Sequence, residues 1–141
     1  MNLRDTAAAW QPQAQALLRI VVGYLFLSHG AAKLLGVPHV AMFDNLQVFS
    51  LIGVAGILEL VGGTLFLVGL CTRVVAFVLS GEMAVAYWMV HAPRNVFPAL
   101  NGGDAAILYC FIFLFLVFAG PGALSVDGAQ RERSGSWLPG R

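Results

Sequence analysis

Four long apolar segments divide the chain, and shorter polar connections separate them. The segments cover residues 14–36, 49–70, 73–91 and 104–119. Their lengths are near the ~20 residues that a helix needs to cross the hydrocarbon core of a bilayer. A segment that lies in lipid must satisfy its backbone N–H and C=O groups internally, so uninterrupted runs of this kind predict helices. The pattern therefore predicts an all-α membrane protein, built as a four-helix transmembrane bundle.

The connections contain the residues that interrupt helices. Pro38, Pro93, Pro98 and Pro121 all lie between the apolar runs. The connection over residues 38–49 is half apolar and too short to cross a bilayer. It predicts a short interfacial helix between the first and second spans.

The chain then divides into three parts. Residues 1–13 form an N-terminal segment, residues 14–122 form the membrane domain, and residues 123–141 form a polar tail that is rich in Gly and Ser. The low hydrophobicity of this tail predicts that most of it is disordered. No small-residue cleavage site follows the first apolar run, so this run is interpreted as a retained span.

The placement of arginines predicts the orientation in the membrane. An even number of spans puts both termini on the same side. That side carries Arg4, Arg73, Arg131, Arg133 and Arg141, and the opposite side carries Lys33 and Arg94. Because cytoplasmic connections are enriched in Lys and Arg, both termini are predicted to be cytoplasmic.

Composition argues against a soluble domain. Hydrophobic residues make up 59% of the 141 residues and charged residues only 11%, whereas a soluble domain is about half apolar and about a quarter charged. With a mean hydropathy of +0.81, the chain has the lipid bilayer as its first expected partner. A formal net charge of +1 gives no reason to expect nucleic acid. Cys71 and Cys110 fall toward opposite membrane faces in this topology and are interpreted as free thiols.

Two acidic residues interrupt the apolar runs near mid-membrane depth, where a charged carboxylate costs ~2.5–3.5 kcal/mol. Glu59 shares a narrow helical arc with Gly56 and Gly63. Two roles stay open for Glu59: pairing with a group such as Arg19 or a His that locks the bundle, or participation in a site. Glu82 faces away from the polar stripe of its own segment. Its role stays open between a neutral carboxyl, a contact with the fourth span and a contact with another subunit.

Glycines share the polar face of the first and second spans. At 100° per residue, Arg19, Gly30 and Lys33 fall within one arc of the first span. Small residues at a helix interface let two backbones approach closely. We therefore expect Gly56 and Gly63 to bring the second span close to another helix.

A polar pocket is predicted toward the outer face, where several spans bring polar groups to one level. The candidate pocket residues are His29, Lys33, Glu59, His91, Asn101 and Asp104, and the supporting residues are Arg19, Gly30, Gly63 and Arg73. No residue is assigned a catalytic role, and no metal site is predicted. Simpler alternatives stay open. Lys33 could snorkel to the headgroups beside a packed His29, and Asp104 could stabilise the N-terminus of the fourth span.

Four stretches of the chain together resemble the DoxX family of small four-span bacterial membrane proteins. They are "LLRIVVGYLFLSHGAAKLLG", "GILELVGGTLFLVGLCTR", "AYWMVHAPRNVFPALNGGDAAILY" and "GPGALSVD", and they span residues 17–127. The positions that match the family's pattern are Arg19, His29, Gly30, Lys33, Glu59, Gly62, Gly63, Arg73, His91, Asn101, Gly102 and Gly103. Asp104 departs from the pattern, which more often has Glu at this place. The resemblance implies a multi-pass protein of the bacterial inner (cell) membrane.

The resemblance also implies an association with redox chemistry. The family is named for a subunit associated with thiosulfate:quinone oxidoreduction in archaea, and other members are linked to oxidative-stress and thiol-redox complexes. The resulting hypothesis is a redox-associated subunit whose polar pocket could bind a quinone. His29, His91 and Lys33 could donate hydrogen bonds to the quinone oxygens, and Glu59 could relay protons.

Other functions stay open, as does the question of whether the protein is an enzyme. The sequence contains no flavin, nicotinamide or iron–sulfur fingerprint, so electrons would come from a redox partner protein or a diffusible reductant. One alternative is a non-catalytic scaffold that anchors a partner protein. Another is a small-solute transporter, for which four short helices would have to form a homo-oligomer. A haem held by His29 and His91 is a further alternative.

Overall fold

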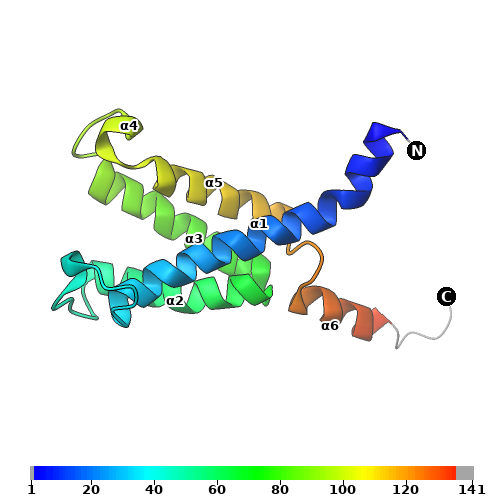
Figure 1. The fold of residues 1–141 in the computed structure, drawn as a ribbon, viewed down its shortest axis with the longest axis horizontal. Helices are drawn as coiled ribbons and strands as arrows, with labels where there is room; N and C mark the ends of the chain where they lie inside the picture. The colour runs from blue at the N-terminus through cyan, green and yellow to red at the C-terminus, as the bar shows by residue number, and fades with distance from the viewer. Residues whose placement is uncertain (1, 136–141) are drawn as a thin grey trace.

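The computed structural model describes residues 2–135, which form helices and connecting loops without a β-strand. The elements in chain order are α1 (Leu3–Leu34), η1 (Ala41–Phe43), α2 (Leu51–Val68), α3 (Thr72–Ala86), η2 (Tyr87–His91), α4 (Pro98–Asn101), α5 (Asp104–Ala119) and α6 (Val126–Gly135). The long helices run back and forth, and the start of α1 and all of α6 lie at the same end of the bundle (Figure 1).

Three helical stretches of the described chain are long and apolar enough to cross a membrane. They are Arg4–Leu34, Leu51–Val68 and Thr72–His91, the last of which continues α3 through the π-helical η2. The apolar helix α5 has 16 residues, which gives a length of about 24 Å. The predicted all-α membrane fold is therefore confirmed, with α5 shorter than the three spanning stretches.

Glycines allow α1 and α2 to pack with their backbones in contact. A Cβ atom placed on Gly63 would lie 2.6 Å from the backbone N of Leu27, and one placed on Gly30 would overlap the backbone of Leu60. A Cβ on Gly56 would lie 3.1 Å from the Lys33 side chain. The expected close approach at Gly56 and Gly63 is therefore confirmed, and α1 is the partner helix.

Aromatic side chains connect this helix pair to the other half of the bundle. Phe113 of α5 is fully buried, and its ring meets Phe26 of α1 and Phe66 of α2 edge to face, with centroid distances of 4.7 and 5.0 Å. Edge-to-face pairs of this kind add ~0.5–1.5 kcal/mol each to the burial of the rings. The helix α5 packs in turn against α3. The four apolar helices therefore share one core.

The two ends of the chain differ from the sequence-based expectation. The helix α1 starts at Leu3, well before residue 14, because Asn2 and Asp5 form a reciprocal capping box at its N-terminus. The prediction of disorder after residue 122 is wrong for Val126–Gly135, which forms α6. The Ser125 hydroxyl accepts a hydrogen bond from the Gly128 N–H at 3.0 Å and so starts this helix. The rest of the predicted disordered tail, residues 136–141, lies outside the described residues.

The connection between the first two spans is less helical than expected. It contains η1, a 3-10 helix of three residues, none of them buried. Ser50 then caps α2 by accepting a hydrogen bond from the Gly53 N–H at 3.1 Å. The predicted interfacial helix is therefore a single short turn.

Candidate functional site

A buried ion pair joins α1 to α2. The Lys33 Nζ atom, in the last turn of α1, lies 2.6 Å from Oε1 of Glu59, in the middle of α2. The two side chains are only 14% and 6% exposed. The small size of Gly56 is what brings the Lys33 stem against α2, since the position of its absent Cβ is 3.1 Å from the Lys33 Cβ. The sequence suggested Arg19 or a His as the partner of Glu59, and the structure corrects this to Lys33.

A second carboxyl group faces the same ion pair. Glu82 of α3 lies within electrostatic reach of both Glu59 and Lys33. Its two carboxyl oxygens are buried and have no hydrogen-bond partner among the described residues. The Oε2 atom of Glu59 is buried and unpartnered in the same way. Buried polar atoms almost always have a partner, so these three oxygens are the candidate polar groups of a binding site.

A cavity of about 200 Å³ lies beside this group, between α2 and the α3–η2 helix. Lys33 and Glu82 are its two charged lining residues, and the rest of the lining is apolar. Val54, Met89 and Val90 line it and are also exposed on the outer surface of the bundle. In a membrane protein this surface faces lipid. The cavity therefore combines one ammonium and one carboxyl group with an apolar wall that continues into the bilayer.

His91 and Asn101 lie together, in a cluster of their own. The His91 Nδ1 atom lies 3.0 Å from the Asn101 carbonyl oxygen. The buried Asn101 side chain accepts from the Gly103 N–H at 2.7 Å and donates to the Asn95 carbonyl at 2.8 Å. These bonds hold the loop around α4. Within residues 2–135, no hydrogen bond or ion pair connects the cluster to Lys33 or Glu59.

The remaining predicted pocket residues, His29 and Asp104, are exposed. Neither side chain takes part in a hydrogen bond or ion pair among the described residues. Asp104 is the acidic residue in the first turn of α5, where a negative charge interacts favourably with the helix dipole. The structure therefore supports the simpler role for Asp104 and gives His29 no contact with the Lys33–Glu59 pair.

The supporting residue Arg19 organises the opposite end of the bundle. Its side chain is fully buried. The guanidinium donates to the carbonyl oxygens of Phe66 and Leu67 at the end of α2 and to those of Pro121 and Leu124. The first two carbonyls lie in the last turn of α2, where the helix itself supplies few N–H donors, so the guanidinium helps to satisfy them. Arg19 therefore connects α1 to the end of α2 and to the loop that follows α5.

The supporting residue Arg73 acts at the same end of the bundle. It donates to the carbonyl oxygens of Val117 and Phe118, in the last turn of α5. A cation at the C-terminus of a helix stabilises it through the helix dipole and by satisfying these carbonyls. Arg73 thus ties the start of α3 to the end of α5.

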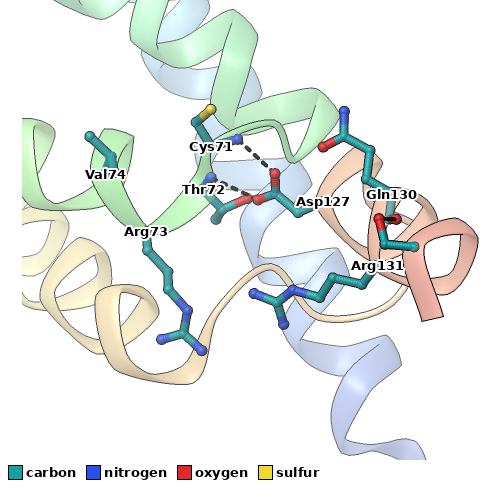
Figure 2. Close-up of a pocket in the computed structure, with 8 residues that line it drawn as sticks. Cys71, Thr72, Arg73, Val74, Asp127, Gln130 and Arg131 are labelled. Carbon is teal, nitrogen blue, oxygen red and sulfur yellow. Dashed lines mark hydrogen bonds between the residues drawn. The ribbon is translucent and has the colours of Figure 1, made fainter. Parts of the chain in front are cut away.

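The sequence did not predict the role of Asp127, although the stretch "GPGALSVD" that ends with it was noted. Its carboxylate accepts the backbone N–H groups of Cys71 and Thr72, each at 2.8 Å, and so caps α3 from α6 (Figure 2). Burial by itself would raise the pKa of this carboxyl, but the hydrogen bonds from Thr72 and Cys71 and the nearby Arg131 outweigh burial and lower it. The local signal was an acid following a Gly–Pro–Gly turn.

The described residues contain no group of three His, Cys, Asp or Glu side chains that could hold a metal ion. The two cysteines are both free thiols, Cys71 exposed and Cys110 half-buried.

Comparison with known proteins identifies the family of the chain. The family model described as DoxX matches residues 14–92, from the first part of α1 through η2 and on to Ala92. The chain belongs to the DoxX family. The DoxX match covers all three residues of the buried charged group, Lys33, Glu59 and Glu82, whereas α5 and α6 lie beyond it.

Two relatives of this DoxX chain span most of its length. An uncharacterized protein from Haemophilus influenzae is 44% identical over 122 residues, covering 84% of this chain and 91% of the relative. The uncharacterized membrane protein Rv3486 from Mycobacterium tuberculosis is 28% identical over 156 residues, covering 87% of this chain and 85% of the relative. No solved structure matches the chain.

Proposed function

We propose that this DoxX protein is a redox-associated membrane subunit that binds a quinone headgroup in the cavity between α2 and the α3–η2 helix. The observation that carries the proposal is the pairing of a donor, Lys33, with an unpartnered acceptor, Glu82, in the lining of an otherwise apolar cavity. Ligand pockets are typically apolar with a few placed polar groups. This cavity has that character.

The two charged groups match the two oxidation states of a quinone. A quinone carries two carbonyl oxygens that accept hydrogen bonds, and its reduced form carries two hydroxyl groups that donate. The Lys33 ammonium has three N–H donors, and Glu59 uses one of them. The remaining donors are available to a quinone carbonyl, and the free oxygens of Glu82 are available to a hydroxyl of the reduced form.

The size and position of the cavity fit a ring with its tail outside. Pockets for drug-sized ligands measure roughly 300–1,000 Å³, and this one measures about 200 Å³. A single six-membered ring is the appropriate occupant. An isoprenoid tail attached to it would run along the exposed side chains of Val54, Met89 and Val90 and continue into lipid.

The charges also provide for proton movement. One ammonium faces two carboxyl groups, and the electrically balanced arrangement therefore carries one proton on the carboxyls. Charge imbalance at this depth is costly. Oxidation of the reduced ring releases two protons together with two electrons. One proton is held by Glu82 and shared with Glu59, whose Oε2 is unpartnered, and the second leaves to the outer aqueous phase. The electrons pass to or from a redox partner protein or a diffusible reductant, since the sequence holds no cofactor fingerprint.

Orientation forms part of the proposal. The start of α1 and α6 lie at one end of the bundle (Figure 1), and Arg4, Arg131 and Arg133 belong to these helices. By the positive-inside rule this end faces the cytoplasm of the bacterial inner membrane. The cavity beside Lys33, in the last turn of α1, then opens toward the outer half of the bilayer.

The test is to purify the full chain in mild detergent and to measure quinone in the extracted lipids. We expect quinone to co-purify with the wild-type protein and to fall about tenfold or more in Lys33→Gln and in Glu82→Gln, because a hydrogen bond to a charged group contributes roughly 1.5–3 kcal/mol. Glu132→Gln is the matched control, since Glu132 lies exposed on α6. Quinone retained equally by all four proteins would contradict the proposal.

A non-catalytic scaffold is the second candidate, and the Lys33–Glu59 pair favours it. In that function the pair only fixes the register of α1 against α2. A substitution at Glu82 distinguishes the two candidate functions, because the Glu82 carboxyl makes no hydrogen bond that could hold the helices together. A Glu82→Gln protein that assembles normally but loses quinone supports the redox subunit. One that keeps every measurable property supports the scaffold.

A further inference from the structure

A second cavity lies at the other end of the bundle, between the first turn of α3 and α6. Its volume is about 510 Å³, and its lining includes Cys71, Arg73, Val74, Asp127, Arg131 and Ser134 (Figure 2). We propose that this groove binds the headgroup of an anionic phospholipid. The inference does not depend on the quinone proposal, since no residue is shared between the two cavities.

The charge of the groove is positive. Arg73 comes from α3 and Arg131 from α6, and both side chains line the groove (Figure 2). Asp127 is the acidic lining residue, and both of its oxygens are already bound by the backbone N–H groups of Cys71 and Thr72. The two arginines therefore outnumber the carboxylate, which is turned toward the start of α3.

The guanidinium groups keep donors for a ligand. Arg73 uses Nη1 for the carbonyls of α5, and neither its Nε nor its Nη2 is engaged in the hydrogen bonds of residues 2–135. The Arg131 guanidinium makes no hydrogen bond or ion pair within residues 2–135 and interacts with Asp127 through longer-range electrostatics. Arginine binds phosphate through two parallel N–H donors. One phosphate between the two arginines would satisfy donors that the protein leaves open.

The surroundings of the groove select a lipid over a free anion. Val74 lines it, and Phe77 and Phe118 are exposed large apolar residues on the adjoining helices α3 and α5. Fatty-acid chains would cover this surface while the phosphate lies between the arginines. Basic pockets at the ends of membrane helices bind anionic headgroups in this way. Inorganic phosphate would gain the charge interaction alone.

The experiment is a lipid titration on the full-length protein in mild detergent, followed by native mass spectrometry. Phosphatidylglycerol is compared with phosphatidylcholine of the same acyl chains. We expect phosphatidylglycerol to bind more tightly, and Arg131→Gln to weaken it about fivefold, as expected for one basic residue at an anionic surface. Ser134→Glu, which adds a carboxylate to the exposed rim, should weaken it as well. Neither variant should change the binding of phosphatidylcholine.

The control is Arg4→Gln, which removes the same charge from an exposed position of α1 at the same end of the bundle. The proposal is overturned if Arg4→Gln weakens phosphatidylglycerol as much as Arg131→Gln does, because the attraction is then not local to the groove. It is also overturned if the two lipids bind equally. Competition by inorganic phosphate at the concentration of the lipid would assign the groove to a free anion instead.

Discussion

Lys33 and Glu59 lie on neighbouring helices that touch through glycine, and their side chains form an ion pair of 2.6 Å inside the bundle. A buried pair of this kind gains little over an apolar pair of the same shape, because both charges lose their hydration. Its position next to a third ionisable group, Glu82, is the reason we propose a function for this part of the bundle.

Replacing one member of the ion pair should lower the free energy of unfolding more than replacing both members. Lys33→Met leaves the Glu59 carboxylate buried without its partner, and we expect a loss of about 3–5 kcal/mol in unfolding free energy. The double variant Lys33→Met, Glu59→Met should recover most of that loss. Thermal unfolding in detergent measures the stability of the single and of the double variant. Equal destabilisation by the single and the double variant would contradict a coupled pair.

The close approach of α1 and α2 should fail when a methyl group is added at Gly63. The Cβ of Gly63→Ala would lie 2.6 Å from the backbone N of Leu27, so the helices must separate, and overpacking of this kind costs roughly 1–3 kcal/mol. Gly81→Ala is the matched control, since its Cβ meets no atom within 4 Å. The control should gain up to about 1 kcal/mol from helix propensity.

Unfolding of purified protein in the same detergent compares the two alanine variants. A melting temperature that changes equally in Gly63→Ala and Gly81→Ala would show that the backbones are farther apart than the structure places them.

The anchoring of α6 should depend on pH through Asp127. Its pKa is lowered in the folded protein, so the stabilisation it gives is complete above the unfolded value of about 3.9 and is lost as the pH falls through the folded pKa. Asp127→Asn should lack this component and be flat over the same interval. Glu132→Gln, exposed on the same helix, should keep it.

Hydrogen exchange of α6 amides, followed from pH 6 downward, reports this anchoring directly. If Asp127→Asn and the wild-type protein lose protection of α6 in parallel, the cap from Asp127 to α3 does not hold the helix.

Most of the fold could be predicted from hydrophobic pattern alone, because lipid forces apolar runs into helices. The glycine faces could also be predicted, since Gly56 and Gly63 repeat at a helical spacing beside Glu59. What pattern could not give was the partner of each charge. Arg19 and Lys33 share one face of α1, and only the vertical offset of α2 decides that Glu59 meets Lys33 while Arg19 reaches the end of α2.

The candidate site was predicted in part. Lys33 and Glu59 contact each other at the candidate site, whereas His91 and Asn101 contact each other in the loop around α4. Glu82 was noted without a role because a helical projection shows only its own helix. In the packed bundle, the face of α3 that carries Glu82 lines the cavity beside α2. Asp127 was missed because its partners lie 55 and 56 residues away.

The quinone site is tested most directly by locating a bound quinone on the chain. A photoreactive quinone analogue, added to the full-length protein in detergent and activated by light, labels the residues around its ring, and peptide mass spectrometry identifies them. We expect labelling of residues 51–58 and 85–90, with loss of the label in Glu82→Gln and no loss in Glu132→Gln. Even labelling of all lipid-facing helices, including α5, would contradict a quinone site beside Lys33 and Glu82.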